Sequence, residues 1–247
     1  MQEEINVNKL SVSYYGKQVI SNVSFSFESG KLIGIIGPNG AGKSTMMKAM
    51  LGLIPRDSGE VMIENQPLQT IQKKIAYVPQ RSNIDWDFPI IVKDTVLLGT
   101  FPKLGLFRRP KKRDRNWAIE CLTKVGMEKY AKNQIGELSG GQQQRVFLAR
   151  ALAQKAEYFF LDEPFVGIDV ASEEVIIRIL KDLRNEGKTV FVVHHDLSKV
   201  KNYFDDLVLI NKKIISSGPV EYVFQPKLMQ KAYNYSLSMM ESIGGEV

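Results

Sequence analysis

The sequence has few of the residues that mark secreted proteins and metal centres. Its 247 residues include one cysteine, Cys121, and two histidines, His194 and His195, which are neighbours. A single cysteine cannot form an intramolecular disulfide, so we expect a reducing, cytoplasmic setting. One cysteine and two adjacent histidines do not make a convincing ligand set for a transition metal either.

Long apolar runs are also missing. The longest runs contain four apolar residues, as in residues 158–161 and 190–193. A helix that crosses a bilayer needs about 20, so we expect no membrane-spanning segment. The first ten residues contain no apolar core, and we expect no secretory signal.

The composition is that of an ordinary globular domain, with 44% hydrophobic and 24% charged residues and a net charge of +6. The positive charge is concentrated in one segment, residues 103–115. That basic segment fits either contact with an anionic membrane surface or a solvated helix face. Its basic residues are Lys103, Arg108, Arg109, Lys111, Lys112, Arg113 and Arg115.

Strand-like apolar runs alternate with helical patterns, which predicts an α/β fold with a largely parallel sheet. The predicted buried strands are residues 31–36, 156–161, 189–193 and 207–210, and the clearest helices are residues 44–53 and 172–186.

The remaining parts of the chain differ from this core. Shorter strand patterns at residues 5–10, 19–27 and 61–63 predict an antiparallel patch near the N-terminus. We therefore predict one domain. It has a core lobe, residues 1–82 and 156–247, and an inserted helical lobe, residues 83–155.

A glycine-rich segment supplies the strongest motif. Residues 37–45 match G-x-x-x-x-G-K-[ST], follow a predicted strand and open a predicted helix, which is the context that this motif requires. Backbone N–H groups of such a loop surround phosphate oxygens, Lys43 adds a positive charge, and Ser44 offers a hydroxyl to Mg²⁺. The alternative is a glycine-rich turn with a structural role only. The predicted phosphate-binding residues are Gly37, Pro38, Asn39, Gly40, Ala41, Gly42, Lys43, Ser44 and Thr45.

Two adjacent carboxylates, Asp162 and Glu163, follow the buried strand at residues 158–161. Successive side chains of a strand point in opposite directions, so the two carboxylates can serve different roles. We expect Asp162 to hold Mg²⁺ and Glu163 to orient or deprotonate an attacking water. Without other motifs, two adjacent carboxylates after an apolar run are more often the solvated end of a strand. The predicted phosphate loop favours the functional interpretation of this pair.

A second helix start lies at Ser139, Gly140, Gly141 and Gln142. Ser139 and Gln142 have the spacing of a capping box, and a strongly helical stretch follows. A helix N-terminus framed by glycine and a hydroxyl suits an anion, but an ordinary helix cap explains the same residues.

These motifs together resemble the nucleotide-binding subunit of ATP-binding cassette (ABC) transporters. The resemblance extends from about residue 5 to about residue 232, with the motifs in family order. It implies a P-loop NTPase (RecA-like) core, ATP and Mg²⁺ as ligands, and ATP hydrolysis as the activity.

The resemblance also implies roles for single residues. Tyr15 is similar to the aromatic residue that stacks on adenine, with Tyr14 as the alternative. Gln80 is similar to the glutamine that touches Mg²⁺ and senses the γ-phosphate. His195 is similar to the histidine that hydrogen-bonds this phosphate, whereas His194 is interpreted as structural. Asp169 lies in the loop that links the two active sites, although residues 165–169 depart from the usual form.

In this family two copies pair head to tail, so that Ser139–Gln142 of one copy faces the nucleotide of the other. A second copy of the chain and an integral membrane permease are therefore the implied partners, with an extracellular metal-binding protein acting indirectly and no nucleic acid. The implied location is the cytoplasmic face of the cell membrane, as a peripheral subunit.

A narrower resemblance points to the manganese, zinc and iron uptake branch, and within it to manganese importers. It rests on residues 81–89, 108–110, 134–137, 142–145 and 192–196. Within the first of these segments, Trp86 and Phe88 are either docking residues for the permease or packed inside the helical lobe.

The alternatives are zinc or iron as cargo, or a soluble ABC-type ATPase acting on ribosomes or DNA. A small-molecule kinase with a phosphate loop is weaker, because it leaves Gln80, Ser139 and His195 unexplained.

Overall fold

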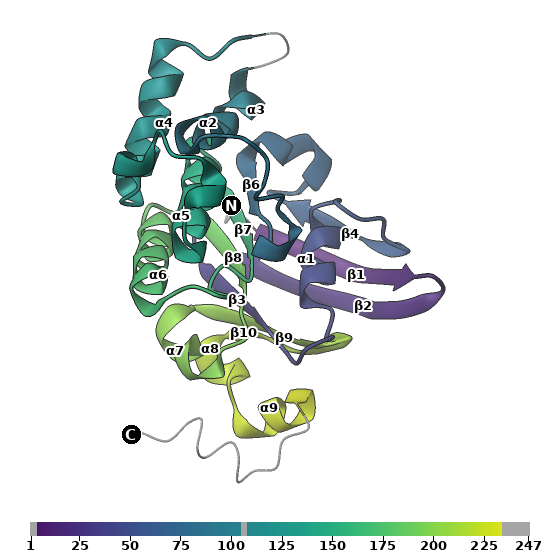
Figure 1. Cartoon of the computed structure of the whole chain (residues 1–247). Helices are drawn as coiled ribbons and strands as arrows, with labels where there is room; N and C mark the ends of the chain where they lie inside the picture. The colour runs from purple at the N-terminus through teal and green to yellow at the C-terminus, as the bar shows by residue number, and fades with distance from the viewer. Residues whose placement is uncertain (1–3, 105–107, 234–247) are drawn as a thin grey trace. The chain divides into compact units, whose positions relative to one another are not determined.

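The computed structural model describes residues 4–104 and 108–233 of the chain. The chain forms two compact units (Figure 1). Unit 1 consists of Met1–Gln72 and Thr189–Val247, and unit 2 consists of Lys73–Lys188.

Unit 1 contains an antiparallel sheet with the strand order β2-β1-β4-β5. Its long hairpin, β1 and β2, turns at Tyr15 and Gly16, which both have positive φ. Along β2, buried Ile20, Val23 and Phe25 are separated by more exposed residues, as expected for a strand with one apolar face. The strands are β1 (Glu4–Tyr14), β2 (Lys17–Glu28), β4 (Ser58–Ile63) and β5 (Gln66–Pro67).

Unit 1 also contains four strands of a second sheet, in the order β10-β9-β3-β8. Strand β3 pairs in parallel with both β8 and β9, and β10 is antiparallel to β9. All residues of β3 and β8 are buried, which explains their continuous apolar sequences. The strands are β3 (Leu32–Ile36), β8 (Thr189–Val193), β9 (Asp206–Asn211) and β10 (Lys213–Pro219).

The helices of unit 1 are short. The first, α1 (Lys43–Met50), follows β3 after a loop and buries both Met46 and Met47. The others are α7 (Val200–Tyr203), α8 (Val220–Val223), α9 (Pro226–Tyr233) and the 3₁₀ helix η6 (Leu197–Lys199). A further 3₁₀ helix, η1 (Leu68–Lys74), crosses the boundary of the two units.

Unit 2 combines a parallel strand pair with most of the helices. Strands β6 (Ile75–Val78) and β7 (Tyr158–Asp162) pair in register from Ile75 with Tyr158 to Val78 with Leu161. The helices are α2 (Val92–Leu97), α3 (Phe101–Leu104), α4 (Lys112–Lys124), α5 (Gly140–Ala153) and α6 (Val170–Asn185). The 3₁₀ helices are η2 (Arg81–Asn83), η3 (Leu98–Thr100), η4 (Glu128–Tyr130) and η5 (Ile135–Glu137).

Helices α2, α4 and α5 pack against one another and form the helical core of unit 2 (Figure 1). Cys121 of α4 is fully buried in this core, and burial raises the pKa of its thiol to about 12. In the described residues, no helix has the length and hydrophobicity that a membrane span requires.

The predicted α/β fold, with parallel strands, an N-terminal antiparallel sheet and a helical region, is confirmed. The predicted lobes divide the chain differently from the compact units, because β7 and α6 lie in unit 2 together with the helices. The lobe boundaries at residues 82/83 and 155/156 stay a prediction.

Candidate functional site

The segment between β3 and α1 has the backbone of a tight anion-binding loop. Gly40 and Gly42 have φ values of 75° and 94°, which side-chain-bearing residues rarely adopt. Gly37 has no room for a side chain, because a Cβ there would lie 2.0 Å from the carbonyl oxygen of Ile210. The backbone N–H of Ala41 donates to the Pro38 carbonyl at 3.1 Å, and Lys212 N–H donates to the Ala41 carbonyl at 2.9 Å.

Lys43 is buried at the start of α1 although it carries a charge. Its ammonium Nζ donates to the carbonyl oxygens of Gly37 at 2.8 Å and Pro38 at 3.1 Å. The ammonium therefore ties the first residue of α1 back to the start of the loop. Asn39 and Gly40 at the loop tip are exposed, and Ser44 and Thr45 are half-buried.

The end of β8 brings His194 and His195 beside the end of β3. Ile35 pairs with Val193, and the backbone N–H of His194 donates to the Ile35 carbonyl at 3.0 Å. His195 is exposed, whereas His194 is buried, with its ring centroid 5.5 Å from that of Phe204. Within unit 1, His195 and the loop that starts at Gly37 thus follow the same edge of the sheet.

Tyr14 and Tyr15 lie at the tip of the β1–β2 hairpin. Tyr15 occupies the turn with φ 51°, and its side chain is fully exposed, whereas Tyr14 is 40% exposed. A flat, exposed ring can stack on another aromatic system without first leaving a packed core.

In unit 2, Gln80 and Glu163 meet beyond the ends of the parallel strands β6 and β7. The Gln80 amide Nε2 donates to Glu163 Oε2 at 2.6 Å. Glu163 has φ 51°, in the left-handed region that is costly for a residue with a Cβ. Strained backbone of this kind is concentrated at functional sites, and here it follows directly after a buried strand.

Asp162, the last residue of β7, is fully buried. Burial, and to a smaller extent the negative charge of Asp162, raises the pKa of the Tyr77 hydroxyl on the neighbouring strand. The phenol therefore stays protonated across the physiological range. A buried carboxylate at a strand end is a hard oxygen donor of the kind that Mg²⁺ prefers.

The first turn of α5 has the predicted capping box. Gln142 N–H donates to Ser139 Oγ at 3.4 Å, and Ser139 N–H donates to Gln142 Oε1 at 2.9 Å. Gly141 is required by packing, because a Cβ there would lie 2.3 Å from Ser172 Oγ. Ser172 itself is bound by the carboxylate of Asp169, which caps α6.

Trp86 and Phe88 behave differently. The Trp86 ring lies 5.3 Å from the Phe147 ring in an edge-to-face arrangement, and its Nε1 donates to the Arg81 carbonyl at 3.0 Å. These contacts favour the alternative in which Trp86 packs on the helical region, where it is half-buried. Phe88 is 57% exposed, which leaves its docking role a prediction.

The sequence indicates Arg81 and Gln143 only as members of the segments 81–89 and 142–145 and predicts no role of its own for either, although both stabilise this region. Arg81 Nε donates to Gln143 Oε1 at 3.0 Å, and Gln143 Nε2 donates to the Ile135 carbonyl at 3.2 Å. The available signal was the position of Arg81 directly after Gln80.

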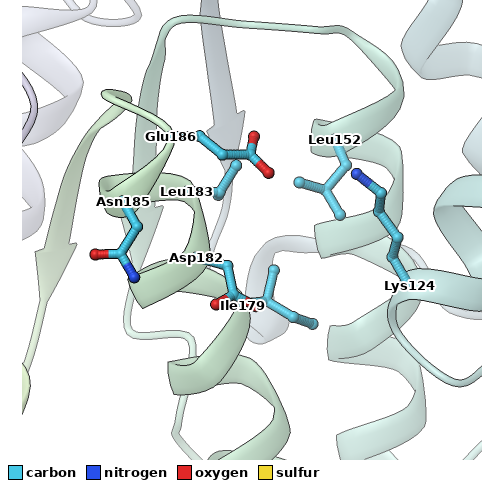
Figure 2. Close-up of a pocket in the computed structure, with 7 residues that line it drawn as sticks. All are labelled: Lys124, Leu152, Ile179, Asp182, Leu183, Asn185 and Glu186. Atoms are coloured by element: carbon cyan, nitrogen blue, oxygen red, sulfur yellow. The ribbon is translucent and has the colours of Figure 1, made fainter.

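A pocket of about 450 Å³ lies elsewhere in unit 2 (Figure 2). Figure 2 shows Lys124 and Leu152 facing side chains of α6 across it. Its lining residues are Lys124, Leu152, Ile179, Asp182, Leu183, Asn185 and Glu186, none of which belongs to the predicted site. Among the described residues, no group of three or more His, Cys, Asp or Glu side chains is arranged to hold a metal ion.

Comparison with known proteins identifies the family of the chain. Residues 20–166 match the ABC transporter family. The manganese transport system ATP-binding protein MntB of Listeria innocua is 56% identical over 229 residues, which cover 93% of this chain and 95% of the relative. The zinc transport system ATP-binding protein TroB of Treponema pallidum is 48% identical over 234 residues, 95% of this chain and 88% of the relative.

A solved structure gives the same result for the fold. A metal-chelate type ABC transporter, in an inward-facing conformation, contains a chain with a TM-score of 0.82 and 26% identity, covering 94% of this chain and 89% of that one. The phosphate loop, the strand-end carboxylates and the capped α5 are thus found in a chain that matches one family over most of its length. The chain belongs to the ABC transporter family, as one of its ATP-binding subunits.

Proposed function

We propose that this chain hydrolyses ATP to power the import of a divalent transition metal, manganese, through a separate membrane permease. The observation that carries the proposal is the 56% identity, over 93% of the chain, to a protein named as a manganese transport ATP-binding component. The hydrogen bond between Gln80 and Glu163 supports the hydrolytic part of the proposal.

ATP binding is assigned to the loop residues 37–45 and to Tyr15. Backbone N–H groups of the loop and the Lys43 ammonium would hold the β- and γ-phosphates, because both supply positive charge at a helix N-terminus. Tyr15 would stack on adenine, since its ring is the more exposed of the two hairpin tyrosines.

Mg²⁺ fits the donors that the chain offers. The Ser44 hydroxyl, the Gln80 amide oxygen and the Asp162 carboxylate are hard oxygen ligands, and such ligands favour Mg²⁺ over softer metals. When bound, Mg²⁺ would neutralise charge on the β- and γ-phosphates.

Glu163 would act as the general base for the attacking water. The Gln80 amide donates to this carboxylate, so it can hold the carboxylate in a fixed orientation. Its amide oxygen would then serve as a ligand for Mg²⁺. His195, exposed at the end of β8, would hydrogen-bond the γ-phosphate as the bond to the leaving ADP breaks.

A second copy of the chain would complete each site. The capped first turn of α5, with Ser139, Gly140, Gly141 and Gln142, would face the γ-phosphate bound by the partner copy, because the N-terminus of a helix attracts an anion. ATP would then favour the closed pair and hydrolysis would release it, because the ligand binds the closed state more tightly.

The permease and an extracellular metal-binding protein would select the cargo. This chain would lie at the cytoplasmic face of the membrane, as a peripheral subunit without nucleic-acid partners. The exposed Phe88 offers an apolar contact for the permease.

Zinc is the second candidate cargo, because the 48% identical relative is named as a zinc transport component. Iron is the third. The mechanism of ATP hydrolysis would be the same for each metal.

The test measures total manganese, zinc and iron by elemental mass spectrometry in source cells grown in metal-poor medium. Cells that carry Glu163→Gln are compared with cells that carry the unchanged chain and with Glu174→Gln, an exposed glutamate of α6. A selective fall in manganese in Glu163→Gln alone supports the proposal.

A fall in zinc or iron instead would correct the cargo. No change in any metal, with expression shown and other uptake routes deleted, would contradict metal import. ATP hydrolysis by the purified chain at an unchanged rate in Glu163→Gln would contradict the catalytic assignment.

A further inference from the structure

Gln80 and Arg81 are consecutive residues whose side chains reach two different elements of unit 2. The Gln80 amide donates to Glu163, beyond the end of β7, at 2.6 Å. Arg81 Nε donates to Gln143, in the first turn of α5, at 3.0 Å. A change in the backbone at this dipeptide therefore acts on both contacts at once.

Trp86 fixes Arg81 from the other side. The Arg81 guanidinium carbon lies 5.5 Å from the centre of the Trp86 ring, and Trp86 Nε1 donates to the Arg81 carbonyl at 3.0 Å. The Trp86 ring packs edge-to-face on Phe147, a buried residue of α5. Both the side chain and the backbone of Arg81 are thus connected to α5.

Gln143 has a buried side-chain amide whose oxygen and nitrogen both form hydrogen bonds. It accepts from Arg81 and donates to the Ile135 carbonyl at 3.2 Å. Its backbone N–H donates to the Ser139 carbonyl at 2.8 Å, which makes it part of the capped first turn. Loss of Arg81 would leave the buried amide oxygen without this donor, and such a loss is costly.

Gly140 shows how little space surrounds this turn. A Cβ at Gly140 would lie 3.4 Å from the Arg81 guanidinium carbon and 3.0 Å from the Gly167 carbonyl oxygen. The first turn of α5 is therefore confined between Arg81 and the segment that leads into α6.

We propose that Arg81 is a positioning residue that couples Gln80 to the first turn of α5. Through Gln143 it holds Ser139–Gln142 in the orientation that the partner's nucleotide needs, so that the contact of Gln80 with Glu163 and the presentation of α5 are linked. The catalytic part of this inference rests on the proposed function, whereas the structural coupling does not.

The first experiment is hydrogen exchange on the full chain. Arg81→Met keeps the length of the side chain and removes its donors. Arg178→Met is the matched control, because Arg178 is an exposed arginine of α6 in the same unit. Exchange at the amides of Gln142 and Gln143 should become about 10-fold faster in Arg81→Met and change less than about twofold in the control.

The second experiment separates positioning from binding. In Arg81→Met we expect kcat for ATP hydrolysis to fall about 10-fold, with KM for ATP within about twofold of the unchanged chain. Gln143→Leu should give a similar fall, and the double variant should fall no further than about the larger single effect, because both remove one contact. Arg81→Lys keeps a donor but not the planar group over Trp86, so it should restore part of kcat.

Unchanged exchange at Gln142 and Gln143 in both Arg81→Met and Gln143→Leu would overturn the proposal. A kcat in Arg81→Met no lower than in Arg178→Met, or fully independent effects of the two substitutions, would overturn it as well. An unchanged chain that does not hydrolyse ATP would instead contradict the proposed function, and the exchange result would still decide the coupling.

Discussion

The phosphate loop of unit 1 and the first turn of α5 in unit 2 are both glycine-containing turns that open a helix, yet they are stabilised differently. The loop at residues 37–43 is held by backbone hydrogen bonds and by the Lys43 ammonium, which donates to carbonyls of the same loop. The turn at Ser139 is held by its own capping box and by side chains from distant segments, among them Arg81 and Ser172.

This difference separates two kinds of information. A loop that is held by backbone hydrogen bonds and by its own lysine can be identified from a short sequence pattern, even though one of these bonds comes from the distant Lys212 N–H. A turn that is held by distant side chains depends on where the fold brings them, and its tolerance to substitution depends on them as well.

The largest expected effect is on the rate of ATP hydrolysis. It comes from a substitution in unit 2 that should leave ATP affinity, which we assign to unit 1, nearly unchanged. Glu163→Gln removes the proposed general base but keeps an oxygen for the Gln80 amide, so ATP affinity should change little. We expect kcat to fall about 10³-fold, the middle of the range for loss of a general base. Steady-state hydrolysis together with equilibrium ATP binding measures both quantities. Equal losses in kcat and in ATP affinity would contradict the proposal that Glu163 acts in hydrolysis and not in ATP binding.

The reciprocal substitution is Lys43→Ala. It removes the charge proposed for the phosphates and the bonds to the Gly37 and Pro38 carbonyls. ATP affinity should fall about 100-fold, as expected for the loss of a charged hydrogen-bond partner. Titration with ATP measures Kd, and Lys48→Ala, a half-buried lysine of the same helix, serves as the control. An unchanged Kd would show that the loop does not bind phosphate.

Packing around the α5 turn gives the next effect. In Gly141→Ala the new Cβ would meet Ser172 Oγ at 2.3 Å, so one of the two segments must shift. We expect unfolding free energy to fall by about 2 kcal/mol, the usual cost of overpacking. Gly40→Ala meets no neighbouring atom within 4 Å and should cost only about 1 kcal/mol, through its positive φ. Denaturant unfolding compares them, and equal losses would refute the packing argument.

The hairpin tip offers a smaller test. Tyr15→Ala should weaken ATP binding about 10-fold, the usual cost of losing a base–aromatic stack, whereas Tyr14→Ala should change it by less than about twofold. Competition between ATP and GTP for each variant would show whether the base is being contacted. The opposite ranking of the two tyrosines would assign the stacking role to Tyr14.

The smallest effect is a pH dependence at the start of α6. The backbone N–H and the hydroxyl of Ser172 donate to Asp169, which lowers the pKa of this carboxylate below its ordinary value of 3.8. A lowered folded-state pKa stabilises the fold above the ordinary value, and the stabilisation is lost as pH falls through the lowered one. Asp169→Asn should therefore reduce the difference between the denaturant midpoints of unfolding measured at pH 6 and at pH 3. Ser172→Ala, which removes the hydroxyl donor, should give part of the same change. An unchanged difference would assign no role to this carboxylate.

Local patterns predicted much of the fold and of the candidate site. The buried strand before Gly37, the capping box at Ser139 and the strand that ends at Asp162 each depend on residues that are close in sequence. Parallel pairing of β6 and β7 then places Gln80 and Glu163 within hydrogen-bonding distance, although 83 residues separate them.

The side-chain contacts were beyond the reach of the sequence. Trp86 is followed closely by another aromatic residue, Phe88, and nothing in the local pattern says which of them packs. The fold decides it, because Phe147 and the Arg81 carbonyl meet Trp86 and leave Phe88 exposed. The same holds for Arg81, whose partner Gln143 lies 62 residues away.

The buried thiol of Cys121 has a practical consequence for measurement. With its pKa raised to about 12 and no exposed sulfur, it should react slowly with maleimides and methanethiosulfonates under mild conditions. The natural chain then needs no cysteine removal before labelling. Cysteines introduced at exposed positions, such as Lys111 in unit 2 and Tyr222 in unit 1, would carry spin labels with little background. Distance distributions between such labels, measured with and without ATP, would show whether nucleotide binding changes the separation of the two labelled positions.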